Sequence, residues 1–219
     1  MTSQLKEFTS SAARPLPVIL LADISGSMAA EGKIGALNQS IREMLSTFSS
    51  TDDLRAEIHV AIITFGGIAR VHTPLEAAKA VKWADMQADG GTPMGAAMTL
   101  AADLIDDKEA IPSRAYRPTV VLVSDGMPTD SWREGLDRMT KQGRAQKADR
   151  LALAIGADAD TGMLKRFLND DNKQVFVAAD ARRIKDFFQF VTMSVTARSR
   201  SANPNEIPQM RNPFDLDRL

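Results

Sequence analysis

Oxygen-bearing side chains stand directly after two strongly apolar segments of the sequence. Asp23 ends the first segment and is followed by the hydroxyls of Ser25 and Ser27. Asp125 ends the second segment, and a separate glycine-rich stretch, GGTPMG, carries the hydroxyl of Thr92. Two carboxylates and three hydroxyls are hard donors that suit Mg²⁺, Mn²⁺ or Ca²⁺ and would not select zinc. If the fold brings the three segments together, these residues predict a divalent-cation site.

The composition of this donor set also predicts how the site would work. Five side chains cannot all reach one ion without crowding, so some of them would act through water. Mg²⁺ in particular requires six oxygens and keeps several of its waters. Because the set carries few formal charges, a bound ion would remain electrophilic and one coordination position would stay open. A carboxylate from a protein partner could fill that position.

The elements that must position these residues can be predicted from the apolar pattern. Continuous apolar runs indicate buried strands, and apolar residues at helical spacing indicate amphipathic helices. Strands are expected at 17–23, 57–65, 69–73, 118–126, 150–157 and 174–179. Helices are expected around 37–48, 75–82, 98–105, 132–146, 161–168 and 184–195.

This alternation predicts an α/β protein with a Rossmann-like, doubly wound fold. We expect a mostly parallel six-stranded sheet with one antiparallel edge strand and helices on both faces. If the strand order is 3-2-1-4-5-6, it reverses between the first and fourth strands, which end in Asp23 and Asp125. Ligands bind at such a reversal, beyond the carboxyl ends of the strands.

The chain length and composition predict one soluble domain. A domain over 15–197 would follow an N-terminal segment, 1–14, and precede a flexible tail or docking arm, 198–219, in which prolines become frequent. The net charge of -1 gives no reason to expect nucleic acid as a partner. No apolar run approaches the roughly 18 residues of a membrane span. Without cysteines or an apolar leader, the expected compartment is the cytoplasm.

Three sequence motifs together resemble a known metal site. DISGSM, the threonine of GGTPMG, and VSDGMPTD are similar to the metal-ion-dependent adhesion site of von Willebrand factor A domains, with its pattern D-x-S-x-S, then T, then D. The resemblance covers about residues 15 to 196. It implies a bound Mg²⁺ or similar cation and protein binding without catalysis. Within this family the chain most resembles bacterial TerY-like proteins of tellurium-resistance and stress systems, which implies a metal-dependent protein phosphatase or a protein kinase as partner.

The resemblance also implies a role for each residue of the motif. Ser25 and Ser27 would bind the metal through their hydroxyls. Thr92 would bind it directly when a partner carboxylate is present. Asp23 and Asp125 would hold waters or bind the ion directly, depending on the state of the site.

Other residues near these motifs have competing interpretations. Met94 and Met127 flank the predicted site in its loops, and we expect these flexible apolar side chains to form a rim for the partner. Asp130 is expected to cap the helix that follows it. Asp158 and Asp160 could reach the same face of the molecule, but helix capping is the preferred interpretation.

The main alternative is a Mg²⁺-dependent phosphohydrolase of the haloacid-dehalogenase type, which also places an Asp after its first strand. Such an enzyme needs a second Asp two residues later, where this chain has Ser25. The nucleophile motif of serine hydrolases and the glycine motif of dinucleotide-binding enzymes are not recognisable either. The sequence therefore predicts a binding module and not an enzyme.

Overall fold

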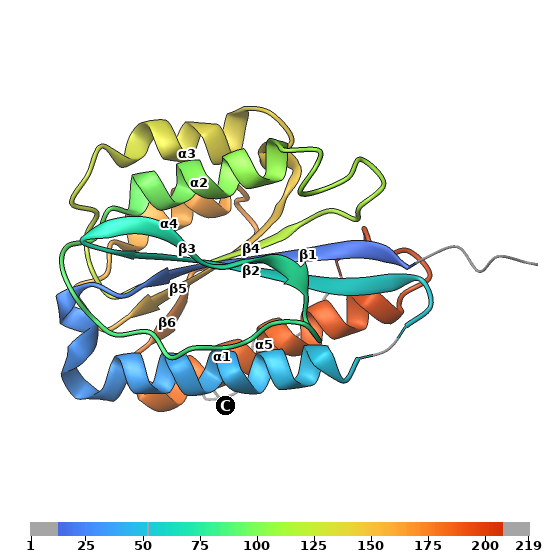
Figure 1. Ribbon diagram of the computed structural model, residues 1–219. Helices are drawn as coiled ribbons and strands as arrows, with labels where there is room; N and C mark the ends of the chain where they lie inside the picture. Colours follow the sequence, from blue (N-terminus) through green and yellow to red (C-terminus); the bar gives the residue numbers. More distant parts are fainter. Residues whose placement is uncertain (1–12, 52, 208–219) are drawn as a thin grey trace, which may run out of the picture.

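A single six-stranded sheet organises the computed structural model, which describes residues 13–51 and 53–207 (Figure 1). The strands lie in the order β3-β2-β1-β4-β5-β6, as predicted. All neighbouring pairs are parallel except β2 and β3, which form an antiparallel hairpin. The strands are β1 (Arg14–Asp23), β2 (Ala56–Gly66), β3 (Ile68–Ala77), β4 (Thr119–Ser124), β5 (Asp149–Ile155) and β6 (Phe176–Ala178).

Helices cover both faces of this sheet, which confirms the predicted fold class. Helices α1 and α5 lie on one face, and α2, α3 and α4 lie on the other (Figure 1). The α-helices are α1 (Lys33–Ser49), α2 (Met94–Asp106), α3 (Trp132–Lys141), α4 (Thr161–Leu168) and α5 (Ala181–Arg200). Two short 3-10 helices, η1 (Gly26–Gly32) and η2 (Ala145–Lys147), precede α1 and β5.

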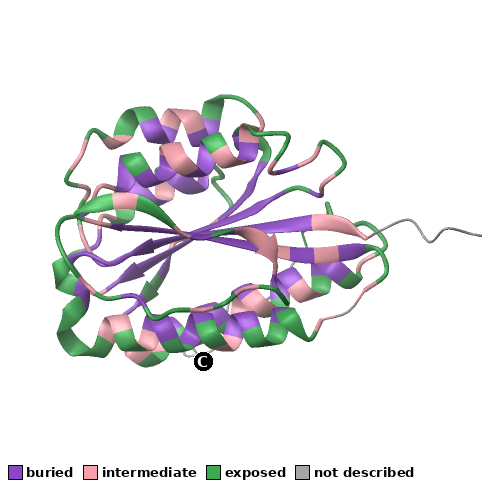
Figure 2. Ribbon diagram, viewed as in Figure 1, coloured by how far each residue is buried: buried purple, intermediate pink, exposed green. Residues whose placement is uncertain are grey.

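The continuous apolar run of β1 reflects burial on both faces of the sheet. Val18 and Leu20 pack in the core under α1 and α5, whereas Ile19 and Leu21 pack in the core under the other three helices. Figure 2 shows the inner strands buried along most of their length, whereas the edge strand β3 is largely intermediate or exposed. Since both faces are covered, every position of such a strand has to be apolar until the strand leaves the core.

The carboxyl ends of β1 and β4 meet at the reversal of the strand order. The parallel register pairs Val18 with Thr119 and Ala22 with Val123. The chain leaves β1 toward α1 on one face and enters β4 from α2 on the other face. Asp23 and Asp125 therefore emerge side by side at the edge where open α/β sheets bind ligands.

Two predicted helices differ from the structure. The helix expected at 75–82 is wrong, because β3 continues to Ala77, which pairs with His59 of β2. An irregular segment then leads to α2. The helix expected at 132–146 ends at Lys141, because Gln142 is extended and Gly143 has a φ of 54°. In the first case, pairing with β2 overrides the helical spacing of the apolar residues. In the second, a glycine in the left-handed region ends the helix early.

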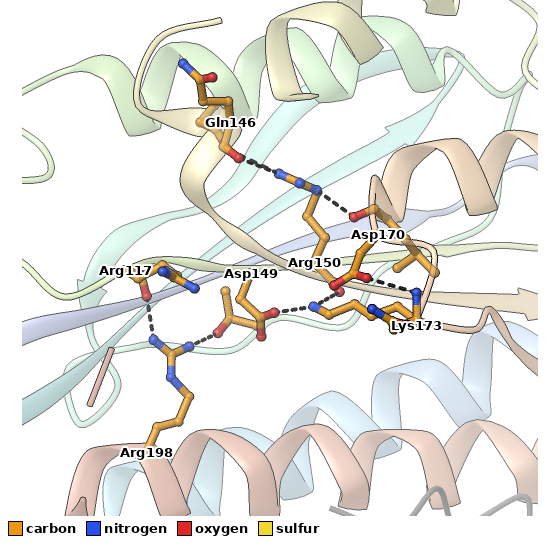
Figure 3. A network of polar contacts seen from close by, with 11 residues as sticks. Arg117, Gln146, Asp149, Arg150, Asp170, Lys173 and Arg198 are labelled. Carbon is orange, nitrogen blue, oxygen red and sulfur yellow. Dashed lines mark hydrogen bonds and ion pairs between the residues drawn. The ribbon is translucent and has the colours of Figure 1, made fainter. Parts of the chain in front are cut away.

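The expected tail boundary at residue 198 falls inside α5. Arg198 is 1% exposed, and its guanidinium donates a hydrogen bond to the carbonyl of Arg117 (Figure 3). It also donates to the carbonyl of Pro204 and to the hydroxyl of Thr119. The residues that directly follow α5 are thereby held against the start of β4. The rest of the expected tail, 208–219, and the N-terminal residues 1–12 lie outside the described residues. Among those that are described, none of the helices is long and apolar enough to cross a membrane.

Candidate metal centre

The carboxylate of Asp23 is fixed at the end of β1. The residue is fully buried. Its Oδ1 accepts a hydrogen bond from the backbone N–H of Ser25 at 2.8 Å, and its Oδ2 accepts one from the hydroxyl of Ser124 at 2.5 Å. Sequence analysis missed Ser124, the last residue of β4, which directly precedes Asp125. The loop after β1 and the end of β4 therefore hold this carboxylate through one contact each.

Burial makes the ionised form of Asp23 costly. It raises the pKa of this carboxyl above its ordinary value, although the hydrogen bonds from Ser124 and Ser25 act in the opposite direction. The neighbouring charge of Asp125 raises this pKa further. A divalent cation beside Asp23 would favour the ionised carboxylate, so this environment fits the predicted ion.

Three of the predicted residues form one chain of hydrogen bonds. The hydroxyl oxygens of Ser25 and Ser27 lie 3.1 Å apart, and Ser27 donates to Oδ1 of Asp125 at 2.7 Å. Ser25 and Asp125 are both buried, whereas Ser27 is exposed. Because the Ser27 proton is directed to the carboxylate, lone pairs of its oxygen remain available for a cation.

Lys33 adds a cation that sequence analysis did not include in the site. Its Nζ donates to Oδ2 of Asp125 at 2.9 Å. Lys33 is the first residue of α1, and a positive charge at a helix N-terminus is normally unfavourable. This unfavourable position is the signal by which the sequence could have shown that Lys33 has a specific partner.

Backbone contacts hold the Thr92 loop against the loop that follows β1 and against the turn between β2 and β3. Gly26 donates to the carbonyl of Gly90 at 2.9 Å, and Gly67 donates to the carbonyl of Gly91 at 3.0 Å. Gly90 has a φ of 73°, and a Cβ on it would lie 2.4 Å from the backbone nitrogen of Gly67. A larger residue at position 90 would push these loops apart.

Thr92 also contacts the loop that follows Asp125. Its N–H donates to the hydroxyl of Thr129 at 2.9 Å, and its carbonyl accepts from the Thr129 N–H at 3.0 Å. Its own hydroxyl lies 3.7 Å from the point where a Cβ on Gly126 would stand. Within the described part of the chain this hydroxyl has no hydrogen-bond partner. Thr92 is therefore placed near Asp125 with an uncommitted oxygen.

Asp130 connects the same two loops. Its carboxylate accepts hydrogen bonds from the N–H groups of Gly95 at 3.0 Å and Ala96 at 2.8 Å. The expectation that Asp130 caps the following helix is wrong, because it caps α2 and not α3. Asp160 does cap its own helix, α4, by accepting from the N–H of Met163 at 2.9 Å, as predicted.

The two methionines of the predicted rim lie in different environments. Met127 is 67% exposed, in the loop that follows Asp125. Met94 is fully buried in the core beneath α2, together with Met98, so the prediction that its side chain belongs to the rim is wrong. Met94 begins α2, and the direction of that helix turns its side chain toward the sheet.

The donors brought together here match the chemistry of a hard divalent cation. Across residues 13–51 and 53–207, no group of three His, Cys, Asp or Glu side chains is placed to hold a metal ion. An ion at this edge of the sheet would therefore depend on hydroxyl oxygens beside the two carboxylates. Such a mixed, oxygen-rich set fits Mg²⁺, Mn²⁺ or Ca²⁺.

Solved structures with the same fold come from several kinds of protein. The pilus adhesin SpaC from Lactobacillus rhamnosus GG is 15% identical over 85% of this chain and 30% of its own, with a TM-score of 0.66. Proximal thread matrix protein 1 from the mussel byssus, described with a zinc-occupied MIDAS motif, is 13% identical over 85% and 49%, with a TM-score of 0.66. A von Willebrand factor type A protein from Catenulispora acidiphila is 20% identical over 84% and 43%, with a TM-score of 0.63.

These likenesses show a shared fold, and the chain spans half or less of the length of these three proteins. The comparison with curated proteins gave no match. A family model, however, matches most of the sequence: that of the von Willebrand factor type A domain aligns with residues 18–190. This chain therefore belongs to the von Willebrand factor type A domain family.

Proposed function

We propose that this chain binds a divalent cation and uses it to recognise an acidic group on a protein partner. The proposed ligands are Asp23, Ser25, Ser27, Thr92 and Asp125, some of them acting through water. The observation that carries the proposal is the hydrogen bond from Ser27 to Asp125, 2.7 Å long, which joins the loops after β1 and β4. Domains of this family are in general interaction modules without enzymatic activity, which supports the same role here.

The proposed cation is Mg²⁺, with Mn²⁺ and Ca²⁺ as close substitutes. The argument is the donor chemistry, because carboxylate and hydroxyl oxygens favour hard cations. The mussel byssus protein is described with zinc in its MIDAS motif, so Zn²⁺ belongs in the same comparison. Calorimetric titration with these four ions would rank their affinities for one preparation of the protein.

The proposed partner is a protein that presents an Asp or Glu side chain at its surface. The resemblance to TerY-like proteins suggests a metal-dependent protein phosphatase or a protein kinase of a tellurium-resistance or stress system as the first candidates. This finer assignment rests on the sequence motifs alone, and neither the family model nor the similar structures add to it. The proposed cytoplasmic location likewise rests on composition.

A pull-down experiment tests the proposal. Immobilised protein would be incubated with candidate partners in Mg²⁺ and in excess chelator, beside the variants Asp125→Asn and Asp158→Asn. Asp158 is an exposed carboxylate after β5, at the same edge of the sheet, and serves as the matched control. We expect capture in Mg²⁺ by the wild type and by Asp158→Asn. Capture that persists in chelator, or in Asp125→Asn, would contradict a metal-dependent interaction.

The phosphohydrolase alternative gains no support from the geometry of Asp23. A nucleophilic carboxylate needs a free oxygen that substrate can reach. Asp23 is fully buried, and each of its oxygens accepts a hydrogen bond. Hydrolysis of a generic phosphate ester that requires Mg²⁺ and disappears in Asp23→Asn would nevertheless reverse this ranking.

A further inference from the structure

Lys33 places a positive charge inside the proposed metal centre. Its Nζ lies 2.9 Å from Oδ2 of Asp125, whose side chain is fully buried, whereas the side chain of Lys33 is 16% exposed. On its other side the amine approaches the end of β5, since a Cβ on Gly156 would lie 3.8 Å from Nζ. The ammonium group is therefore held between β4 and β5, next to the chain of hydroxyls.

The position of Lys33 has a cost, which points to a role beyond helix packing. Lys33 begins α1, where the helix dipole disfavours a cation. The side chain of Lys33 is also only 16% exposed, so its ammonium group loses much of the hydration that a lysine at the surface keeps. The contact with Asp125 offsets both effects and ties the charge of Lys33 to the metal centre.

The charges of the site can be summed from the residues in contact. Asp23 and Asp125 carry one negative charge each when ionised, and Lys33 carries one positive charge. A divalent cation added to the two carboxylates alone would give a neutral site. With Lys33 in place, the loaded site keeps one unit of positive charge, and a single carboxylate from outside would neutralise it.

We propose, on the basis of the function proposed above, that Lys33 sets the specificity of the loaded centre for an anionic group. Its charge repels the cation and so weakens metal binding by the isolated chain. The same charge attracts the carboxylate of the partner and so strengthens partner binding. The charge of Lys33 thereby moves binding free energy from the metal to the partner carboxylate. The ligand class that this favours is a singly charged carboxylate, as in an Asp or Glu side chain.

A purely structural role for Lys33 makes a different prediction. If Lys33 served to anchor α1, its removal would disturb Asp125 and lower both affinities together. The charge effect moves the two affinities in opposite directions. The sign of the two changes therefore separates the two roles.

The experiment compares Lys33→Met, Lys33→Gln and Lys33→Arg with the wild type in two titrations. Calorimetry measures the affinity for Mn²⁺ alone. The relaxation of acetate methyl protons by bound Mn²⁺ then measures the affinity of the loaded site for a simple carboxylate. Lys33→Gln keeps a hydrogen-bond donor for Asp125 without the charge, and Lys33→Arg keeps the charge. Circular dichroism checks that each variant is folded.

We expect Lys33→Met and Lys33→Gln to bind Mn²⁺ about tenfold more tightly and acetate about tenfold more weakly, because one nearby unit charge is removed. Lys33→Arg should stay within about twofold of the wild type in both titrations, because the charge is unchanged. Weaker Mn²⁺ binding by Lys33→Gln, or two affinities that change in the same direction, would overturn this role. Failure of the wild type to bind Mn²⁺ at millimolar concentration would instead refute the proposed function, and this inference with it.

Discussion

The two ends of the sheet both contain buried charges, but they differ in how those charges are satisfied. At the carboxyl end, Asp23 and Asp125 are surrounded by hydroxyls and a single lysine, and the oxygen of Thr92 is uncommitted. At the amino end, Arg150 and Arg198 direct their donors into backbone carbonyls (Figure 3). The first arrangement leaves oxygen donors for a ligand, whereas the second is closed within the protein.

Arg150 illustrates the closed arrangement. Its Nε donates to the carbonyl of Leu168 at 3.2 Å, and its Nη1 lies 3.3 to 3.4 Å from the carbonyls of Met139, Ala145 and Gln146. These carbonyls belong to α3, to α4 and to the η2 region. One guanidinium thus joins several helices to β5. Burial lowers the pKa of this group from its ordinary value, but an arginine remains charged at any physiological pH.

The comparison teaches that burial of a charge does not by itself mark a functional site. A buried ion whose hydrogen-bonding capacity is used by the protein contributes to folding, and its removal leaves unpaired polar groups. A buried carboxylate beside hydroxyls that can still accept a cation is prepared for a ligand. Substitutions at the two ends should therefore affect different measurements.

The largest effect is expected for Arg150→Met, which keeps much of the side-chain length and removes the guanidinium. Four backbone carbonyls would lose a donor, although the carbonyl of Ala145 still accepts from the N–H of Ala148. We expect the free energy of unfolding to fall by about 3 to 5 kcal/mol, because several carbonyls lose a hydrogen bond at once and each unpaired buried group costs about 1 to 3 kcal/mol. Urea denaturation measures this change. Lys147→Met, at an exposed position of η2 nearby, is the control and should change stability by less than about 0.5 kcal/mol.

The affinity of Arg150→Met for Mn²⁺ tests whether a change at the amino end of the sheet affects metal binding at the carboxyl end. We expect it to stay within about twofold of the wild type under conditions where the variant is folded, because sites this far apart behave independently. A large loss of Mn²⁺ affinity would show that the two ends are coupled, and the division between a closed end and a ligand-binding end would fail.

The next largest effect is expected for Asp125→Asn, now on metal binding. The amide keeps the shape of the side chain and can still accept from Ser27, but it loses the negative charge. We expect Mn²⁺ affinity to fall about a hundredfold, since a formal charge in direct or water-mediated contact with the ion is removed. Calorimetry against Asp158→Asn provides the measurement and its control.

Stability of the metal-free Asp125→Asn protein sharpens the contrast with Arg150. Loss of the contact with Lys33 and relief of the repulsion from Asp23 oppose each other. We expect the free energy of unfolding to change by no more than about 1 kcal/mol, the net worth of one hydrogen bond, measured by urea denaturation in chelator. A loss of unfolding free energy as large as that expected for Arg150→Met would mean that the charges at the carboxyl end also stabilise the fold.

The ends of the strands were predictable because local sequence determines them. A run buried on both faces is mostly apolar, so the first charged residues that follow it, Asp23 and Asp125, mark where the chain leaves the core at the ends of β1 and β4. The segment 75–82 has residues with high helix propensity, yet part of it forms β3 because pairing with β2 outweighs that preference. Local patterns therefore locate the candidate site better than they identify an edge strand.

The contacts within the candidate site were less predictable. Ser124 and Asp23 are 101 residues apart in the chain, and Lys33 and Asp125 are 92 apart. No local pattern encodes such pairs, since they depend on the register between β1 and β4 and on the direction of α1. The burial of Met94 likewise depends on how α2 lies on the sheet, whereas the motif residues could be named from their types and spacing.

Among the proposed ligands discussed here, the smallest effect on metal affinity is expected for Thr92→Ala. Ser25 and Ser27 already belong to the chain of hydrogen bonds that ends at Asp125, whereas the Thr92 hydroxyl makes no hydrogen bond to the described residues. We therefore expect Thr92→Ala to lower Mn²⁺ affinity by about threefold and to leave unfolding almost unchanged, because a hydroxyl without a partner adds little to stability. Affinity for the partner at saturating Mn²⁺ should fall by about thirtyfold, a tenfold larger effect that corresponds to about 1.4 kcal/mol.

The difference arises if Thr92 contacts the ion mainly in the partner-bound state. An interaction made in one state biases the equilibrium toward that state, and removing it lowers the affinity for the ligand that selects the state. Ser25→Ala is the matched control, because Ser25 would contact the ion in both states and its loss should reduce metal and partner affinity by similar factors. The measurement is one titration with Mn²⁺ and one with partner for each variant. If Thr92→Ala, like Ser25→Ala, lowers metal affinity and partner affinity by the same factor, Thr92 has no state-specific role. The loaded centre would then bind its partner without a switch in coordination.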